Sequence, residues 1–193
     1  MGVVLAGGAG QRMGGNKAAK KLGPWRLVDL ALKILAQVCP RHVVVTSKVD
    51  ELADLGCRIL ADRWPGQGPL AALATAFLDT KAEGILLMGV DMPLVRPALL
   101  RLLAQAGEGQ RAVTPMSPKG VEPLVSYYHR LCLPAALRLL ESGERRPRFL
   151  LKAVRARVLS AQEVAAADPE GQSFFNVNSP EDLKRAKELV GFF

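Results

Sequence analysis

The sequence has few aromatic residues, few histidines and an odd number of cysteines, and each shortage excludes a class of protein. Aromatic residues make up 5% of the 193 residues, and His42 and His129 show no metal-binding spacing. The three cysteines include no CxxC pair, so neither a disulfide framework nor a zinc cage is expected. No apolar run approaches the ~20 residues of a membrane span, and we expect no signal peptide, since glycines already appear at Gly7 and Gly8. We therefore expect a cytoplasmic protein with reduced thiols and no membrane contact.

The chain is basic, with a formal net charge of +8 at pH 7. Such a balance permits a nucleic-acid surface or a site for small polyanions such as triphosphates. The cations are spread along the sequence without interleaved aromatics, and the densest group, at residues 145–148, is short. We therefore predict a solvated basic surface around a small-polyanion site, and no binding of nucleic acid.

The apolar residues predict one α/β domain over residues 1–193. Hydrophobic residues make up 49% of the chain, enough for one sizeable core. Buried strands are predicted at residues 2–5, 42–46, 58–61 and 84–90, and helices at 27–38, 70–78, 99–106 and from 179 onward. This alternation predicts a three-layer, Rossmann-like fold with a mostly parallel central sheet. The less regular second half, around residues 112–128, predicts an antiparallel strand within that sheet.

A glycine-rich segment, LAGGAGQRMGGNK at residues 5–17, follows the first predicted strand. Ligands of open α/β sheets bind at the carboxyl ends of strands, and glycines let backbone N–H groups approach a polyanion. Arg12 and Lys17 add cations that can neutralise a triphosphate. A dinucleotide fingerprint fails at Met13, and a Walker A loop fails because Ala18 follows the lysine. The segment therefore predicts a phosphate site of another kind.

Two further strands end in carboxylates. Asp91 follows the run 84–90, and one or two carboxylates with substrate phosphates are the usual ligands of protein-bound Mg²⁺. Taken alone, an Asp before Pro93 reads as a turn, but the glycine-rich segment favours a metal site. Asp62 follows the strand 58–61 and is placed to accept from a ribose or base, or to reach the metal through water. The glycines and proline of residues 66–69 either form a backbone wall around a base or serve as turn residues.

Near the end of the chain, Asn176 and Asn178 lie on one face of the backbone if the segment is extended. Their amides are then placed to donate to an acceptor substrate. The alternative is a turn with a helix cap, in which Ser179 is the N-cap and Asp182 is the third helical residue.

Together these segments resemble the molybdenum cofactor guanylyltransferase family. The resemblance is carried by LAGG and RMG within residues 5–14, Lys17, Asp62, GPLA at 68–71, DMP at 91–93, EPL at 122–124 with Tyr127, and NVNSPEDL at 176–183. The matches follow one another in the family's order along essentially the whole chain. The first segment marks the wider nucleotidyltransferase class, and the last two sharpen the resemblance to the guanylyl branch.

The resemblance implies that the terminal phosphate of molybdenum-bound molybdopterin attacks the α-phosphorus of GTP and releases pyrophosphate, with Mg²⁺ as cofactor. The nucleophile is already an anion, so catalysis is positioning and charge neutralisation. The implied catalytic residues are Lys17 and Arg12, on the triphosphate, and Asp91, on the metal. Implied nucleotide contacts are Leu5, Ala6, Gly7, Gly8, Lys17, Thr46, Asp62, Gly68, Pro69, Leu70 and Asp91, and implied acceptor contacts are Asn176 and Asn178. We expect a monomer that contacts other cofactor-synthesis or molybdoenzyme-assembly proteins only transiently.

The sequence also departs from the family's pattern. Asn16 stands where the family usually has Asp, Ala72 replaces a glycine, and Val90 replaces a cysteine. Two alternatives therefore stay open. One is a related transferase: a cytidylyltransferase for the same cofactor, or a guanylyltransferase of cobalamin or deazaflavin-cofactor synthesis. The other is a non-catalytic nucleotide-binding module, against which the presence of Lys17 and Asp91 argues.

Overall fold

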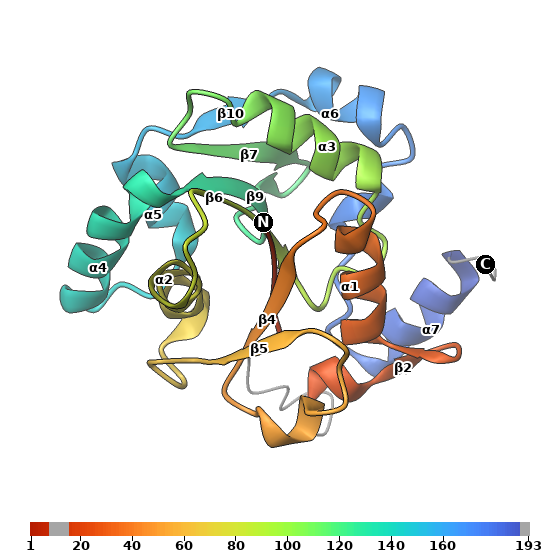
Figure 1. The fold of residues 1–193 in the computed structure, drawn as a ribbon. Helices are drawn as coiled ribbons and strands as arrows, with labels where there is room; N and C mark the ends of the chain where they lie inside the picture. The colour runs from red at the N-terminus through yellow and green to blue at the C-terminus, as the bar shows by residue number, and fades with distance from the viewer. Residues whose placement is uncertain (8–15, 190–193) are drawn as a thin grey trace.

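A computed structural model describes residues 1–7 and 16–189 and shows a central sheet between two layers of helices (Figure 1). The strand order is β10-β7-β9-β6-β1-β4-β5, with β8 paired to β7. The strands are β1 Gly2–Leu5, β4 His42–Thr46, β5 Arg58–Ala61, β6 Gly84–Gly89, β7 Ala112–Ser117, β8 Gly120–Val121, β9 Val125–His129 and β10 Arg157–Leu159. Strands β6, β1, β4 and β5 are parallel, whereas β9 runs antiparallel to β6 and β7. The predicted fold class is confirmed, including the antiparallel strand in the second half.

The helices divide between the two faces of the sheet. One face carries α1 Leu27–Ala36, α3 Pro97–Ala106, α6 Ala161–Ala167 and α7 Pro180–Leu189, and the other carries α2 Gly68–Asp79, α4 Leu133–Glu141 and α5 Pro147–Ala153. Short 3-10 turns lie at η2 Lys17–Ala19, η3 Asp50–Leu52, η4 Arg130–Cys132 and η5 Gln172–Phe174, and a small hairpin joins β2 Lys21–Leu22 to β3 Trp25–Arg26. None of the described helices is both long and apolar enough to span a membrane.

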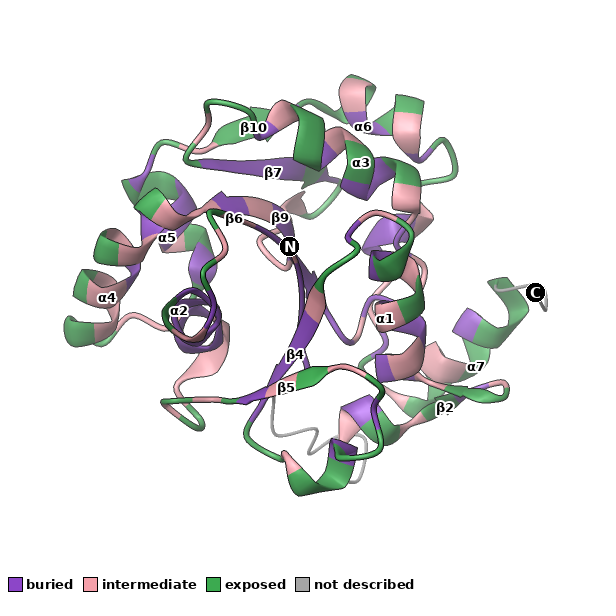
Figure 2. Ribbon diagram, in the orientation of Figure 1, coloured by how far each residue is buried: buried purple, intermediate pink, exposed green. Residues whose placement is uncertain are grey.

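The central strands β1, β4 and β6 are buried on both faces, as Figure 2 shows in purple, whereas the edge strands β5 and β10 are partly exposed. Successive side chains of β1 point to opposite layers, so Val4 packs on the side of α1 while Val3 and Leu5 pack on the side of α2. This two-sided burial explains why the strands read as continuous apolar runs rather than as alternating ones. The predicted strands 2–5, 42–46 and 58–61 coincide with β1, β4 and β5.

Hydrogen-bonded caps are present at the starts of α7 and α6, and only the first of these helices was predicted. At the start of α7, the Asp182 N–H donates to Ser179 Oγ at 3.1 Å, and the Ser179 N–H donates to Asp182 Oδ2 at 2.9 Å, as the cap prediction requires. Helix α6 was not predicted, although Ser160 and Glu163 form a reciprocal capping box at its start. With only 7 residues, this helix is too short to show a clear apolar period.

A buried carboxylate fixes the chain just before residues 176–178. Asp168 accepts hydrogen bonds from the N–H groups of Gln172 at 3.2 Å and Ser173 at 2.8 Å. The Arg96 guanidinium lies 3.6 Å from the same carboxylate, and the Arg96 N–H donates to Ser173 Oγ at 3.0 Å. The start of α3 and the turn η5 are thereby joined, which sets the path of the chain toward the strand ends.

We expect Asp168→Ala to lower the free energy of unfolding by about 2 kcal/mol or more, because it leaves buried N–H groups without acceptors. Urea unfolding monitored by circular dichroism measures the change. Glu170→Ala is the matched control, since Glu170 pairs with the same Arg96 but its side chain is 58% exposed. An exposed pair contributes little, so equal losses in the two variants would contradict the assigned role of Asp168.

Candidate active site

The candidate site lies at the carboxyl ends of the adjacent parallel strands β6, β1, β4 and β5. Backbone hydrogen bonds continue the sheet beyond these ends: Val90 N–H to Leu5 O at 3.1 Å, Ala6 N–H to Val45 O at 2.9 Å, and Asp62 N–H to Thr46 O at 2.9 Å. The segments that leave the four strands therefore start from one edge of the sheet. This edge brings together the predicted residues Ala6, Thr46, Asp62 and Asp91.

The sheet topology places a switch point between β1 and β6. From β1 the chain crosses one face through α1 to reach β4, and from β5 it crosses the other face through α2 to reach β6. Strands β4 and β6 thus lie on opposite sides of β1. Ligands of open α/β sheets bind where the strand order reverses in this way, and here Asp91 and the glycine-rich segment both begin at that point.

Lys17 and Asp91 meet at the switch point. The Lys17 ammonium lies 3.2 Å from Asp91 Oδ2 and donates to Asn178 Oδ1 at 2.8 Å. The side chains of the ion pair are each 19% exposed, so they are partly desolvated yet reachable from solvent. Three segments that are distant in sequence therefore converge on one ammonium group, as required if the end of the glycine-rich segment and Asp91 serve the same ligand.

The position of Asp91 depends on its neighbours. A Cβ atom at Gly89 would lie only 2.7 Å from Asp91 Oδ1, so glycine at 89 leaves the room into which this carboxylate folds. The Asp91 carbonyl accepts a hydrogen bond from the Val177 N–H at 2.8 Å. Backbone and carboxylate of Asp91 are thus both set by contacts that the sequence patterns did not indicate.

Asn16 connects the turn η2 to the segment that follows β4. Its Oδ1 accepts from the Ala18 N–H at 3.1 Å, while its Nδ2 donates to Glu51 Oε2 at 2.6 Å. Lys48 donates to the other oxygen of Glu51 at 2.8 Å. The Lys48 ammonium, helped by the Asn16 amide, lowers the pKa of the Glu51 carboxyl. An aspartate at 16 retains the cap on Ala18 but has no N–H for Glu51.

Asp62 follows β5, which is the farthest from β6 of the four strands whose carboxyl ends form the candidate site. Its Oδ1 accepts from the Trp64 N–H at 3.1 Å and the Thr75 hydroxyl at 3.3 Å. No hydrogen bond from residues 1–7 or 16–189 reaches its Oδ2. Strand β5 lies three strand spacings from β6, or about 14 Å at the usual separation. Asp62 and Asp91 therefore follow strands that are three spacings apart, and a link from Asp62 to a metal stays a prediction.

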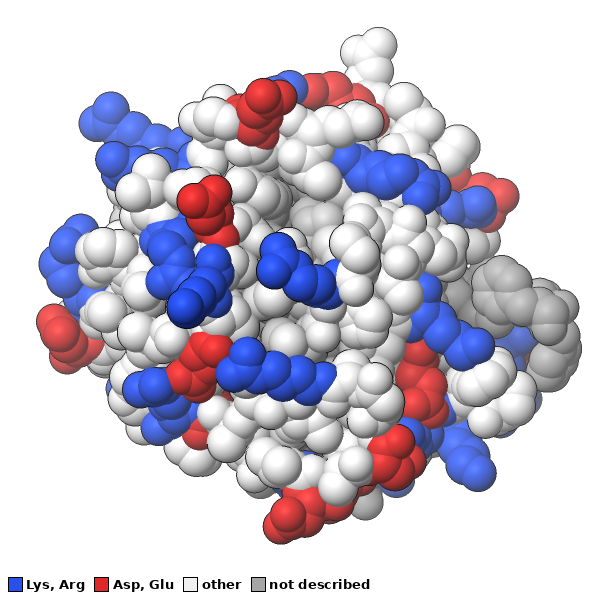
Figure 3. Space-filling model, viewed as in Figure 1, with Lys and Arg blue, Asp and Glu red and all other residues white. Residues whose placement is uncertain are grey.

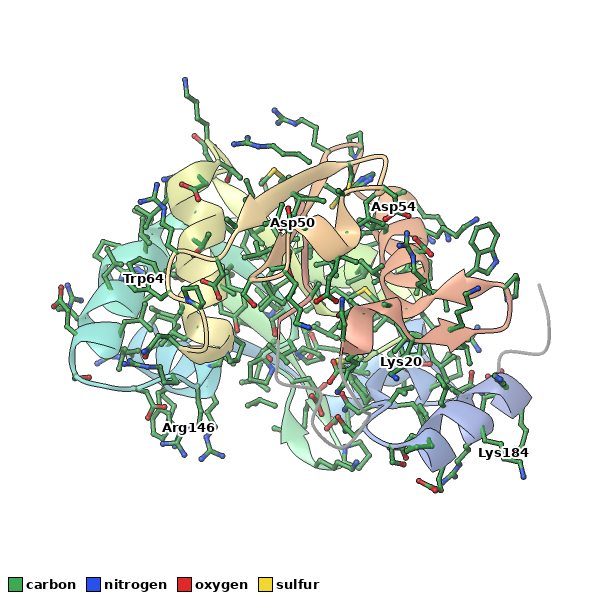
Figure 4. All side chains as sticks on the ribbon, turned by 90° about the horizontal axis from the view of Figure 1, so that it is seen from below. Lys20, Asp50, Asp54, Trp64, Arg146 and Lys184 are labelled. Carbon is green, nitrogen blue, oxygen red and sulfur yellow. The ribbon has the colours of Figure 1, made fainter. Side chains whose placement is uncertain are left out.

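The start of α2 is covered by the loop before α5. Gly68 has φ +80°, and a Cβ atom there would lie 3.2 Å from the Arg145 carbonyl oxygen. That carbonyl accepts from the Leu70 N–H at 3.2 Å, and Leu70 itself is buried. Figure 4 shows Trp64 and Arg146 on this side of the molecule, and Lys20 on the opposite side. Contact of residues 68–70 with a base stays a prediction.

Thr46 is 1% exposed, and its hydroxyl is already engaged. It donates to the Ala6 carbonyl at 3.4 Å and accepts from the Lys48 N–H at 3.0 Å. Thr46 therefore supports the backbone of Ala6 at the end of β1. A direct contact between Thr46 and a base stays a prediction.

Glu122 is a second carboxylate that the motif analysis quoted but did not assign. Its pKa is raised, mainly by burial and least by the negative charge of Asp91. A hydrogen bond from the Ser117 hydroxyl at 2.8 Å and the positive charge of Lys119 act in the opposite direction. In the described part of the chain, no three His, Cys, Asp or Glu side chains form a metal-binding group. Asp91 by itself nevertheless fits a magnesium ion that takes its remaining ligands from phosphate and water.

The remaining predicted residues divide into two groups. Gly8 and Arg12 lie outside the described residues. Asn176 and Asn178 flank the buried Val177, and the Asn176 amide donates to the Phe174 carbonyl at 3.3 Å. On the face drawn in Figure 3, lysines and arginines are scattered among acidic residues rather than gathered in a stripe, in keeping with a solvated basic surface.

Known proteins resemble this chain along almost its full length. A probable molybdenum cofactor guanylyltransferase from Chloroflexus aggregans is 30% identical over 98% of this chain and 94% of its own length. A molybdenum cofactor guanylyltransferase from Desulfosudis oleivorans is 28% identical over 98% of this chain and 95% of its own. The crystal structure of molybdopterin-guanine dinucleotide biosynthesis protein A from Archaeoglobus fulgidus superposes with a TM-score of 0.86 at 29% identity, covering 99% of both chains.

The family comparison agrees with these relatives. Residues 2–160 match the family described as the MobA-like NTP transferase domain, a span that includes β1, the switch point and Asp91. The site geometry, the fold and the sequence matches therefore lead to one conclusion: this chain is a nucleotidyltransferase that belongs to the MobA-like NTP transferase family.

Proposed function

We propose that this chain transfers GMP from GTP to the terminal phosphate of molybdenum-bound molybdopterin and releases pyrophosphate. The observation that carries the proposal is the meeting of Lys17 with Asp91 at the switch point, where the ammonium lies 3.2 Å from the carboxylate. The choice of guanine and of the acceptor rests on the names of the relatives and on the NVN segment.

The adjacent carboxyl ends of β6, β1, β4 and β5 suggest how the nucleotide lies. We place the triphosphate over β1 and β6, beside Lys17, Arg12 and the backbone of residues 5–8. The guanosine then extends across β4 toward Asp62 and residues 68–70, a distance of about three strand spacings, or ~14 Å. In this orientation the second oxygen of Asp62 accepts from a ribose hydroxyl.

The proposed step forms a bond between an acceptor phosphate oxygen and the α-phosphorus, and breaks the bond from that phosphorus to the bridging oxygen. The electron pair leaves with pyrophosphate. The attacking phosphate is already ionised, so no side chain has to remove a proton. Lys17 offsets the charge that develops on the leaving group and orients it, which are the main contributions available in phosphoryl-type transfers.

Mg²⁺ is the proposed cofactor, held by Asp91 with the charge of Glu122 nearby. When bound, it supplies charge neutralisation to the phosphates. Lys17 is paired with Asp91, and the positive charge of Lys119 acts on Glu122. The charge of a triphosphate exceeds that of these two cations, which favours the arrival of a metal together with the nucleotide. We assign Asn176 and the amide nitrogen of Asn178 to the acceptor, and we expect the chain to act as a monomer.

Nucleotide choice is tested by thermal shift with GTP, CTP, ATP and UTP, each with and without Mg²⁺. We expect GTP to raise the Tm most, and Mg²⁺ to enlarge the shift. At a nucleotide concentration 100 times Kd, stabilisation is about 2.7 kcal/mol. A larger shift with CTP would assign the chain to a cytidylyltransferase instead.

Asp91→Asn removes the charge that would hold the metal but keeps the size of the side chain. We expect release of pyrophosphate from GTP and molybdopterin to fall by about 100-fold or more, the size of effect seen when a transition-state electrostatic contact is lost, with an unchanged circular dichroism spectrum. Glu108→Gln, at an exposed position beyond α3, is the control and should retain full activity. If the wild-type chain binds nucleotide but releases no pyrophosphate, a non-catalytic binding module is the better description.

Asn16→Asp tests whether the departure from the family's aspartate is linked to Glu51. The new carboxylate would face Glu51 Oε2 across the position of a 2.6 Å hydrogen bond, so like charges would repel. We expect a lower Tm and weaker nucleotide binding in Asn16→Asp, and recovery of both in the double variant with Glu51→Gln. Glu51→Gln alone is the control. Equal effects of Asn16→Asp with and without Glu51 would show that the two residues act independently.

A further inference from the structure

We propose that Asn178 is a positioning residue for Lys17. Its carboxamide oxygen holds the lysine ammonium beside Asp91, so that a remaining N–H of that ammonium is directed at the triphosphate. The inference rests on the proposed function, and it gives Asn178 a role on the nucleotide side in addition to its proposed contact with the acceptor.

The geometry of the ammonium supports this role. Lys17 Nζ lies closer to Asn178 Oδ1, at 2.8 Å, than to Asp91 Oδ2, at 3.2 Å. A lysine ammonium can only donate, so the atom of Asn178 that faces it must be the carbonyl oxygen. The amide nitrogen of Asn178 then points away from Lys17, which leaves its N–H groups for a different partner.

A second acceptor matters because lysine is flexible and Asp91 has a competing task. The four-carbon stem of lysine leaves the ammonium many rotamers, and one contact alone fixes it poorly. If Asp91 takes a metal, its charge is shared between that metal and Lys17. A neutral amide oxygen, in contrast, attracts the metal less and continues to hold the ammonium, since a hydrogen bond to a charged donor is stronger than one between neutral groups.

Asn178 is itself rigidly placed. Val177 is fully buried, and its N–H is bonded to the Asp91 carbonyl at 2.8 Å. The backbone N–H groups of Asn178 and Ser179 each donate to Asp182 Oδ2 at 2.9 Å, and these bonds lower the pKa of the Asp182 carboxyl. The start of α7 is thereby tied to the end of β6, so the Asn178 side chain projects from a fixed base toward Lys17.

The role requires an oxygen acceptor without charge. Asn178→Leu removes the acceptor and frees the ammonium. Asn178→Asp keeps an acceptor but adds a second carboxylate beside Lys17, which competes with the triphosphate for the ammonium. We therefore expect both variants to weaken nucleotide binding, whereas a purely structural role predicts that Asn178→Asp resembles the wild type. Both changes are at an exposed side chain, and thermal melting confirms that each variant is folded.

The test is a double-mutant cycle on the Kd of the Mg²⁺–nucleotide complex, measured by calorimetry without any acceptor. The probe is the nucleotide that stabilises the wild-type chain most among GTP, CTP, ATP and UTP. Loss of a hydrogen bond to a charged group predicts about tenfold weaker binding for Asn178→Leu. In a Lys17→Ala background, the same change should have less than about a twofold effect, because the residue that Asn178 positions is gone. Glu181→Gln, in the first turn of α7, is the control for nonspecific charge and helix effects.

Several outcomes would overturn the inference. An equal loss from Asn178→Leu with and without Lys17 would mean that Asn178 acts on the nucleotide by another route. An unchanged nucleotide Kd with a raised KM for molybdopterin would restrict Asn178 to the acceptor, while the proposed reaction would stand. Absence of binding by all four nucleotides would remove both proposals. A coupled cycle in a chain that releases no pyrophosphate would uphold the positioning role and reject only the transferase reaction.

Discussion

The ion pair of Lys17 and Asp91 is the contact on which the arrangement of the site depends. Asp91 can reach Lys17 only because β6 lies parallel and next to β1, so that the segments leaving both strands start from the same edge. Gly89 leaves the room for the carboxylate, and Val177 holds its backbone from the other side. Separating a partly desolvated ion pair destabilises the fold, because it leaves a charge without compensation. The fold around the switch point therefore favours keeping these two groups together.

The same ion pair bears on the proposed role of a divalent cation. Lys17 offsets the charge of Asp91. The positive charge of Lys119 acts on Glu122, whose ionisation is opposed by burial. A triphosphate bound as proposed would bring several more negative charges to the same end of the sheet. In the proposed function, a metal that arrives with the nucleotide would supply positive charge, and Asp91 would be the strand-end carboxylate that receives it.

The sequence predicted those features that follow from local pattern and from the geometry of parallel sheets. Buried strands read as apolar runs, and Asp62 and Asp91 were assigned to one edge because parallel strands end together. Contacts between distant segments could not be predicted: Asn178 lies 161 residues from Lys17, and Glu51 lies 35 residues from Asn16. Spacing assigned both asparagines of the NVN segment to the acceptor, since no local rule shows that one of them faces a lysine. Helix α6 was not predicted, although Ser160 and Glu163 have the spacing of a capping box. A helix of two turns shows too little apolar periodicity to be recognised.

Departures from a family motif are best judged by the contacts of the substituted residue. Asn16 replaces the family's aspartate, which in isolation removes a charge beside Lys17. Its amide, however, both caps Ala18 and donates to Glu51, and an amide is the group that can do both at once. Glu51 places a carboxylate next to position 16 and is itself paired with Lys48. Glu51 therefore supplies a negative charge next to position 16, while the amide of Asn16 makes the hydrogen bonds. The substitution is consistent with a functional phosphate site.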